Sequence, residues 1–231
     1  MTLAITGASG KTGWRIAAEA LKRGQSVRAI LRPGSVLPPE LHSHGNAEDG
    51  AAKLSVIRTE LSDAAALQQA LQGCEALVIA TGARPSIDLA GPLKVDALAI
   101  RDQIAACKAA GVSRVVLVSS LCAGRWLHPL NLFGLILVWK RLGEQWLQQS
   151  GLSWTIVRPG GLSEDDSRAA VEGIVYSGPD RQESNSIPRR LVAQVCLDAL
   201  DTDDAIERIV EITSSPEQPQ QSLAAWLKLA I

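Results

Sequence analysis

Apolar and polar positions follow two different periods along this chain. Short apolar runs rich in β-branched residues alternate with longer segments whose apolar positions recur at the helical period. This alternation is typical of parallel β-α-β units. We therefore predict an α/β fold: a doubly wound parallel sheet flanked by helices, with a small C-terminal α/β elaboration. The predicted strands are 2–6, 26–31, 54–59, 76–80, 114–119, 153–158, 174–176 and 208–213, and the predicted helices are 11–23, 63–71, 94–110, 132–150, 188–200 and 223–229.

One segment, 32–50, interrupts this alternation. It is rich in proline and glycine, so we expect an irregular surface loop that replaces or shortens the second helix. His42 and His44 lie in it two positions apart, but no further ligand residues cluster around them. We predict no metal site.

The most apolar stretch of the chain is 130–139. It is far shorter than the roughly 20 apolar residues that cross a bilayer, so we predict no membrane span and expect a buried helix instead. Trp139 lies within this stretch, and we expect it to pack in the core. Trp126 fits either core packing or stacking on a planar substrate.

Composition narrows the class of protein. The chain has 231 residues, of which 46% are hydrophobic and 20% are charged, and its formal net charge is −1. These values favour one globular domain over 1–231, with 160–231 as its substrate-side C-terminal part, and give no basic field for a nucleic-acid partner. The N-terminus shows no signal-peptide pattern, so we expect a cytoplasmic protein. We expect the four widely spaced cysteines to be buried and reduced: Cys74, Cys107, Cys122 and Cys196.

A glycine-rich turn lies between the first predicted strand and the first helix. Gly7 permits a tight turn, Gly10 lets the backbone approach a pyrophosphate, and Gly13 lets the helix pack against the sheet. A helix N-terminus at this point favours the negative charge of the pyrophosphate. This placement indicates a Rossmann dinucleotide site, with candidate contacts at Gly7, Ser9, Gly10, Lys11, Thr12 and Gly13.

The second strand indicates which dinucleotide binds. NAD-selective folds place a carboxylate at its end, whereas an arginine there accommodates the 2′-phosphate of NADP. Here the strand ends at Leu31 and is followed by Arg32. Lys11 can bring a second cation near the same phosphate. We therefore predict NADP(H) as the cofactor.

Four motifs together resemble a known family. They are TGASGKTG at 6–13, VLVSS at 116–120, VWKR at 138–141 and TIVRPGGL at 155–162. The chain resembles the atypical short-chain dehydrogenase/reductases, and most of all their NAD(P)H-binding, NmrA-like branch in cyanobacteria and plant chloroplasts. The resemblance extends over nearly the whole chain, through the helix start at 187–189 and Cys196.

The resemblance implies further cofactor contacts beyond the carboxyl ends of the strands. Members of the family place an acidic-hydrophobic pair by the adenine, backbone beside the adenosine ribose and pyrophosphate, serines near the nicotinamide, a lysine on its ribose and a turn against its ring. The usual aspartate of the acidic pair is a glutamate here. In that order, the matching residues are Glu60 and Leu61; Thr81, Gly82 and Ala83; Ser119 and Ser120; Lys140; and Pro159, Gly160, Gly161 and Leu162.

The chain departs from the family at the catalytic tyrosine. In the YxxxK arrangement the lysine ammonium lowers the pKa of a phenol one helical turn away, which then transfers a proton. Ile136 stands four positions before Lys140, and the single tyrosine of the chain, Tyr176, lies elsewhere. Ser120 and Lys140 remain the candidate catalytic residues.

Two functions of different class fit these residues. The first is an NADPH-dependent reductase of a small planar acceptor such as a flavin, quinone or tetrapyrrole, in which hydride transfer needs no tyrosine. The second is a non-catalytic NADP(H)-binding redox sensor or scaffold that acts through a protein partner. Ile136 weakens a third reading, an ordinary alcohol dehydrogenase or epimerase. The helices at 94–110 and 132–150 suit a homodimer interface, and a monomer is the alternative.

Overall fold

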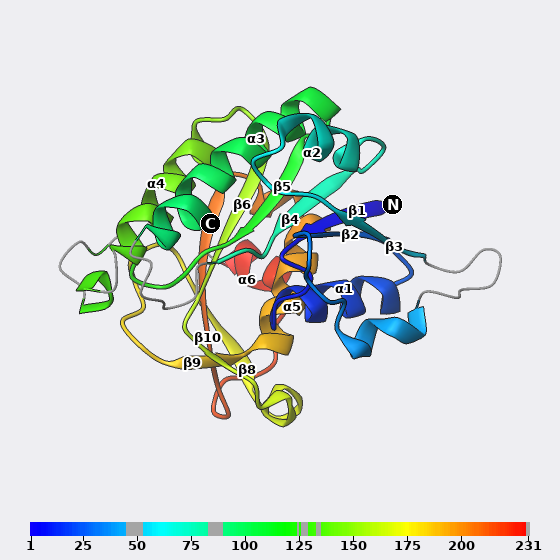
Figure 1. Ribbon diagram of the computed structural model, residues 1–231. Coiled ribbons are helices and arrows are strands. Elements are labelled where there is room, and N and C mark those ends of the chain that lie inside the picture. Colours follow the sequence, from blue (N-terminus) through cyan, green and yellow to red (C-terminus); the bar gives the residue numbers. More distant parts are fainter. Residues whose placement is uncertain (45–52, 83–89, 124, 126–128, 133–134, 230–231) are drawn as a thin grey trace.

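An eight-stranded sheet forms the centre of the protein (Figure 1). In the computed structural model, the described residues are 1–44, 53–82, 90–123, 125, 129–132 and 135–229. The strand order is β3-β2-β1-β4-β5-β6-β10-β8, and all pairs are parallel except β10 with β8. This order confirms the predicted doubly wound sheet. The strands are β1 (Thr2–Thr6), β2 (Ser26–Leu31), β3 (Leu54–Arg58), β4 (Ala76–Ile79), β5 (Arg114–Val118), β6 (Ser153–Pro159), β8 (Gly173–Ser177) and β10 (Arg208–Ser215).

Helices cover both faces of the sheet and bury one apolar layer on each. Figure 1 shows α2 (Ala64–Leu71), α3 (Ala99–Ala110) and α4 (Ile136–Gln148) on one face. The opposite face packs against α1 (Gly13–Lys22), α5 (Arg189–Leu200) and α6 (Leu223–Leu229). Most core strands therefore read as continuous apolar runs, because they are buried on both sides.

The apolar stretch 130–139 differs from the prediction of a buried helix. A 3-10 turn spans Pro129–Leu132, and α4 begins only at Ile136. Leu135 has a left-handed backbone, φ 57°, and both it and Leu132 are exposed. Trp139 is half-buried and lies outside the core clusters, because the inward face of α4 is the one that carries Leu137. Trp126 lies outside the described residues.

The described part of the proline-rich segment, residues 32–44, is more regular than predicted. It contains a 3-10 helix, Pro39–His44, which Leu41 anchors in the core with no exposed surface. The ring Nε2 of His42 lies 3.1 Å from the carbonyl oxygen of Leu37. The described part of the chain holds no cluster of residues that could bind a metal ion.

The C-terminal part adds a small second sheet. Strands β7 (Gly161–Ser163) and β9 (Ser186–Pro188) pair in parallel between β6 and α5. Each is three residues long, too short to show a period, so the sequence did not predict them. All four cysteines are free and buried, as expected. None of the described helices combines the length and apolar character needed to cross a membrane.

A buried arginine joins three elements of the fold. Arg158, near the end of β6, is fully buried. Its Nη2 and Nε donate to the two carboxylate oxygens of Glu144 on α4, at 2.7 and 2.9 Å, and its Nη1 lies 3.0 Å from an oxygen of Asp180. Glu211 on β10, also fully buried, lies 3.5 Å from the same Nη1. Burial alone would lower the pKa of Arg158, but hydrogen bonds and charge from Glu144 outweigh it and raise the pKa.

Glu211 fixes a loop as well as the arginine. Its carboxylate accepts the backbone N–H groups of Asp180, Arg181 and Gln182 at 2.8, 3.0 and 2.9 Å. Charge-assisted hydrogen bonds of this kind are stronger than neutral ones. The network therefore holds α4, β6, β10 and the 180–182 loop in one arrangement.

We predict that Arg158→Met lowers the free energy of unfolding by about 3 to 5 kcal/mol, because Glu144 and Glu211 would stay buried without their cation. Urea denaturation measures the change. The exposed Arg208 at the start of β10 is the matched control, and Arg208→Met should shift the free energy by less than about 0.5 kcal/mol. Equal effects of the two substitutions would contradict the network's role.

Candidate functional site

The turn between β1 and α1 has no room for a side chain at Gly7 or at Gly13. Gly7 has φ 76°, and a Cβ on it would lie 2.6 Å from the carbonyl oxygen of Ala80. A Cβ on Gly13 would lie 2.1 Å from the carbonyl oxygen of Gly7. The N–H of Gly10 closes the turn on the same oxygen at 2.8 Å. The turn thus draws β1, β4 and the start of α1 together, leaving bare backbone at the surface where a pyrophosphate is expected.

The first turn of α1 has an open N-terminus with a cation beside it. Thr12, the N-cap residue, makes no side-chain capping bond. Its hydroxyl instead accepts a hydrogen bond from Nη1 of Arg189, the first residue of α5, at 2.8 Å. The buried Nε of Arg189 has no partner among the described residues, and burial lowers the pKa of the guanidinium. An anion at this helix end would satisfy both groups.

Two buried hydroxyls beyond the sheet also lack hydrogen-bond partners in the described structure. Thr81 follows β4, and Ser119 follows β5. Native proteins rarely leave such groups unsatisfied, so polar atoms of a bound molecule fit here. Both residues belong to the cofactor set that the sequence predicts. Gly82 is exposed beside Thr81, and Ala83 lies outside the described residues.

Lys140 forms an ion pair that the sequence did not reveal. Its Nζ lies 2.7 Å from Oδ1 of Asp96, and the exposed fractions of the two side chains are 13% and 2%. A Cβ built on Gly82 would lie 3.7 Å from this Nζ, so the ammonium faces the backbone after β4. Gly143 allows the approach of α4, because a Cβ there would lie 2.4 Å from the carbonyl oxygen of Asp96.

The ends of β5 and β6 bring the predicted nicotinamide residues together. The N–H of Ser119 donates to the carbonyl of Val157 at 2.7 Å, and that of Leu121 donates to the carbonyl of Pro159 at 2.9 Å. Ser120, between them, is half-buried. Two hydrogen bonds anchor the turn that follows: the N–H of Gly160 donates to the carbonyl of Ile212, and that of Gly161 donates to the carbonyl of Asn185. The side chain of Leu162 is 38% exposed.

Beside Ser120, the missing tyrosine is replaced by apolar packing. Ile136 packs against a small cluster of Leu121, Cys122 and Leu137. Burial raises the pKa of the Cys122 thiol, which keeps it in the neutral form. At position 136, α4 therefore presents an apolar side chain and no hydroxyl.

The part of the edge where the sequence predicts the adenosine carries exposed charges. Arg32 directly follows β2 and is exposed. Arg58 ends β3 and pairs in register with Leu31, which brings a second arginine to this end of the sheet. Glu60 is exposed and Leu61 half-buried just beyond. Lys11 is exposed and pairs with Glu164, which lies just after β7.

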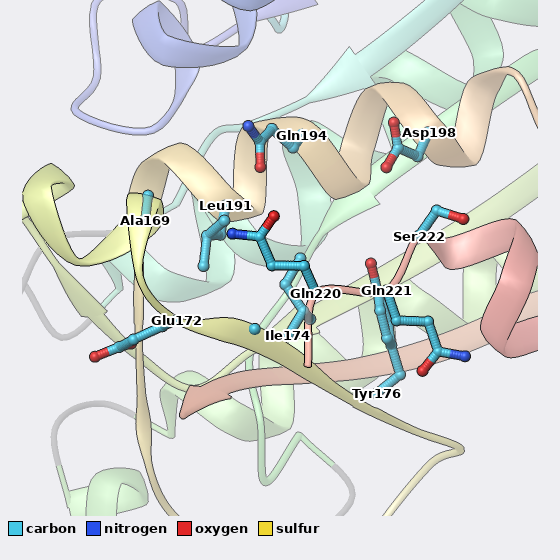
Figure 2. A pocket seen from close by; sticks show the side chains of 11 residues that line it. Ala169, Glu172, Ile174, Tyr176, Leu191, Gln194, Asp198, Gln220, Gln221 and Ser222 are labelled. Carbon is cyan, nitrogen blue, oxygen red and sulfur yellow. The ribbon is translucent and has the colours of Figure 1, made fainter. Parts of the chain in front are cut away.

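A separate cavity of about 280 Å³ lies between α5, β8 and the segment before α6 (Figure 2). Tyr176 lines it and stacks on Trp226, with ring centroids 5.5 Å apart. Burial raises the pKa of the Tyr176 hydroxyl. Tyr176 belongs to the core on the α1 and α5 face, whereas α4, which carries Lys140, packs on the other face. The tyrosine therefore does not replace the one missing at position 136.

The residues missed by the sequence analysis are Asp96 and Arg189. Asp96 lies in a segment whose other signals are helical, and its partner is 44 positions away. Arg189 stands at a helix start that the sequence did indicate, but its neighbour Thr12 is 177 positions away. The sequence signal that could have indicated them is a charged residue on the apolar face of a predicted helix, for Asp96, or in its first turn, for Arg189.

Comparison with known proteins places this site in a family. The family model described as NAD(P)H-binding matches residues 7–203. The chloroplast protein At2g34460 of Arabidopsis thaliana is 34% identical over 229 residues, which cover 94% of this chain and 78% of that one. Sanguinarine reductase of Eschscholzia californica is 28% identical, covering 94% and 90%. A solved structure from Bacillus halodurans, assigned to the NAD-dependent epimerases/dehydratases, matches with a TM-score of 0.82, 25% identity and 99% of both chains. This chain therefore belongs to the NAD(P)H-binding family of atypical short-chain dehydrogenase/reductases.

Proposed function

We propose that this protein is an NADPH-dependent reductase of a small planar acceptor. The observation that carries the proposal is the row of features along the carboxyl edge of the sheet. A turn closed to side chains at Gly7 and Gly13, two buried hydroxyls without partners among the described residues, and a lysine held in an ion pair follow one another from β1 to α4. Their order matches the order of groups along a bound dinucleotide, from pyrophosphate to nicotinamide ribose.

Each part of the edge then has a role. The backbone of 7–13 and the guanidinium of Arg189 hold the pyrophosphate, and Arg32 receives the 2′-phosphate. Thr81 and Ser119 supply hydrogen bonds, and Lys140 holds the nicotinamide ribose. When bound, NADPH supplies the hydride. Besides Arg32 and Arg189, the residues in this proposal are Ser9, Gly10, Lys11, Thr12, Glu60, Leu61, Gly82, Ala83, Ser120, Pro159, Gly160, Gly161 and Leu162.

The acceptor class follows from what replaces the tyrosine. The apolar cluster at Leu121, Cys122 and Ile136 offers no proton at the place where an alkoxide would need one. A conjugated acceptor spreads the electron pair of the hydride over its ring system and takes its proton from water. The name of sanguinarine reductase, a relative over nearly its whole length, also supports a reductase.

The missing tyrosine at position 136 also favours a second function. A protein that binds NADP(H) tightly but has isoleucine at the tyrosine position suits a redox sensor or scaffold, and the exposed Leu132 and Leu135 before α4 offer apolar surface to a protein partner. Loss of reduced-nicotinamide absorbance in the presence of a flavin, a quinone or a tetrapyrrole separates the two functions. Turnover with any of them supports the reductase, and tight NADPH binding without turnover on any of them supports the sensor.

For cofactor choice, we predict that the protein binds NADPH more tightly than NADH and that Arg32→Glu removes the preference. The substitution should weaken the affinity for NADPH about tenfold to a hundredfold, because a charge-assisted contact to the 2′-phosphate is lost. The affinity for NADH should stay nearly unchanged. Calorimetric titration of both nucleotides measures this. Arg208→Glu makes the same charge change at the opposite end of the strands and should alter neither affinity.

For the pyrophosphate, we predict that Arg189→Met weakens NADPH and NADH by the same factor, about tenfold, since both carry the group that Arg189 holds. Binding of 2′-AMP, which has no 5′-phosphate, should not change. The neighbouring Arg190 is exposed, and Arg190→Met is the matched control. A loss confined to NADPH, or an equal loss with 2′-AMP, would show that Arg189 does not contact the pyrophosphate.

A further inference from the structure

Asp96 occupies an unusual backbone position next to the proposed cofactor edge. Residues Leu93–Leu98 form a π-helical turn immediately before α3. Such turns are rare in proteins, and those that do occur are often found at functional sites. This one places the Asp96 carboxylate, whose side chain is 2% exposed, 2.7 Å from the Lys140 ammonium.

The pair is poorly explained by stability alone. Taking two opposite charges out of water costs about as much as their attraction returns, and apolar residues of similar volume often serve as well. The structure nevertheless makes room for it, since Gly143 lets α4 come within contact of the Asp96 backbone. The result is an ammonium held in one place beside Gly82, with its charge balanced.

We propose that Asp96 is a positioning residue that fixes and neutralises Lys140, and that it thereby sets the relative affinity of the site for oxidised and reduced cofactor. The inference rests on the proposed binding of NADP(H) at this edge. The oxidised nicotinamide ring carries a positive charge that the reduced ring lacks. An unbalanced ammonium would therefore disfavour NADP⁺ selectively, whereas a balanced one does not.

The consequence concerns hydride donation. A site that does not penalise the oxidised form keeps bound NADPH a stronger reductant, because the product of hydride loss is not destabilised. This suits a reductase that contributes no proton of its own. Asp96 acts through Lys140 in this account and needs no contact with the acceptor.

The test compares the affinities of NADP⁺ and NADPH, measured by calorimetry on the whole chain without any acceptor. Asp96→Asn should raise the ratio of the NADP⁺ to the NADPH dissociation constant about threefold to thirtyfold, because the Lys140 charge is no longer balanced. Lys140→Met should move the ratio in the opposite direction. The double variant should return it towards the original value, as expected for two residues that act as a pair.

Asp102 supplies the control. It lies on α3 six positions later, pairs with the neighbouring Arg101, and has a side chain that is 26% exposed. Asp102→Asn makes the same charge change at the surface and should leave the ratio unchanged. The proposal is overturned if Asp96→Asn weakens the binding of NADP⁺ and of NADPH equally. It is also overturned if Asp102→Asn shifts the ratio of dissociation constants as much as Asp96→Asn does.

Lys140→Arg keeps the test decisive if Asp96→Asn does not fold. This variant retains the positive charge and an ion pair with Asp96, so its ratio should match that of the unchanged protein while Lys140→Met differs. Equal ratios in Lys140→Arg and Lys140→Met would overturn the proposal. Absence of binding of either nucleotide to the unchanged protein would instead refute the proposed function.

Discussion

The arrangement of the site depends on one buried guanidinium held between two buried carboxylates. Without Arg158, buried Glu144 would keep only its 3.5 Å contact with Arg141, and buried Glu211 would lose its ion pair with Arg158. Because Glu144 lies one helical turn after Lys140, the ion pair sets where α4 lies against β6. Because Pro159 follows Arg158 directly, the same ion pair sets where the nicotinamide turn begins. The lysine and the turn are therefore fixed relative to each other by a group that is fully buried.

Charge along the proposed cofactor edge is distributed in a consistent way. Exposed arginines lie at the adenosine end, where a phosphate is fully charged and solvated, and Arg32 is the example. At the middle, Arg189 is partly buried and incompletely bonded, which suits an anion that is itself shielded. At the far end the cation is balanced, because Asp96 pairs with Lys140. Positive charge thus decreases along the proposed cofactor edge, from the predicted phosphate positions towards the predicted position of the nicotinamide.

The sequence predicts the fold well, because the strands buried on both faces and the glycine turn are local patterns. Lys140 was identified from a motif, and the structure places it at the expected edge. Its partner Asp96 could not be predicted, since the contact depends on a π-helical turn and on the close approach of α4 at Gly143. Arg189 was missed for a related reason: its position over Thr12 results from the packing of α5 on α1. Long-range contacts set by helix packing carry no local signal.

Hydrophobicity misled the prediction at the start of α4. The run 130–139 is the most apolar of the chain, yet Leu132 and Leu135 face outwards and the helix begins only at Ile136. Leu135 has a left-handed backbone at the residue before the helix, and it and Leu132 are the described leucines of this run that stay exposed.

This geometry also bears on the missing tyrosine. The position that would carry a phenol opens α4 and packs against an apolar cluster that includes Leu121 and Cys122. A hydroxyl in such surroundings stays protonated, because burial disfavours the phenolate. The ammonium that would lower its pKa is already balanced by Asp96. Among the described residues, the surroundings of position 136 therefore fit the proposed hydride transfer, in which α4 supplies no phenol.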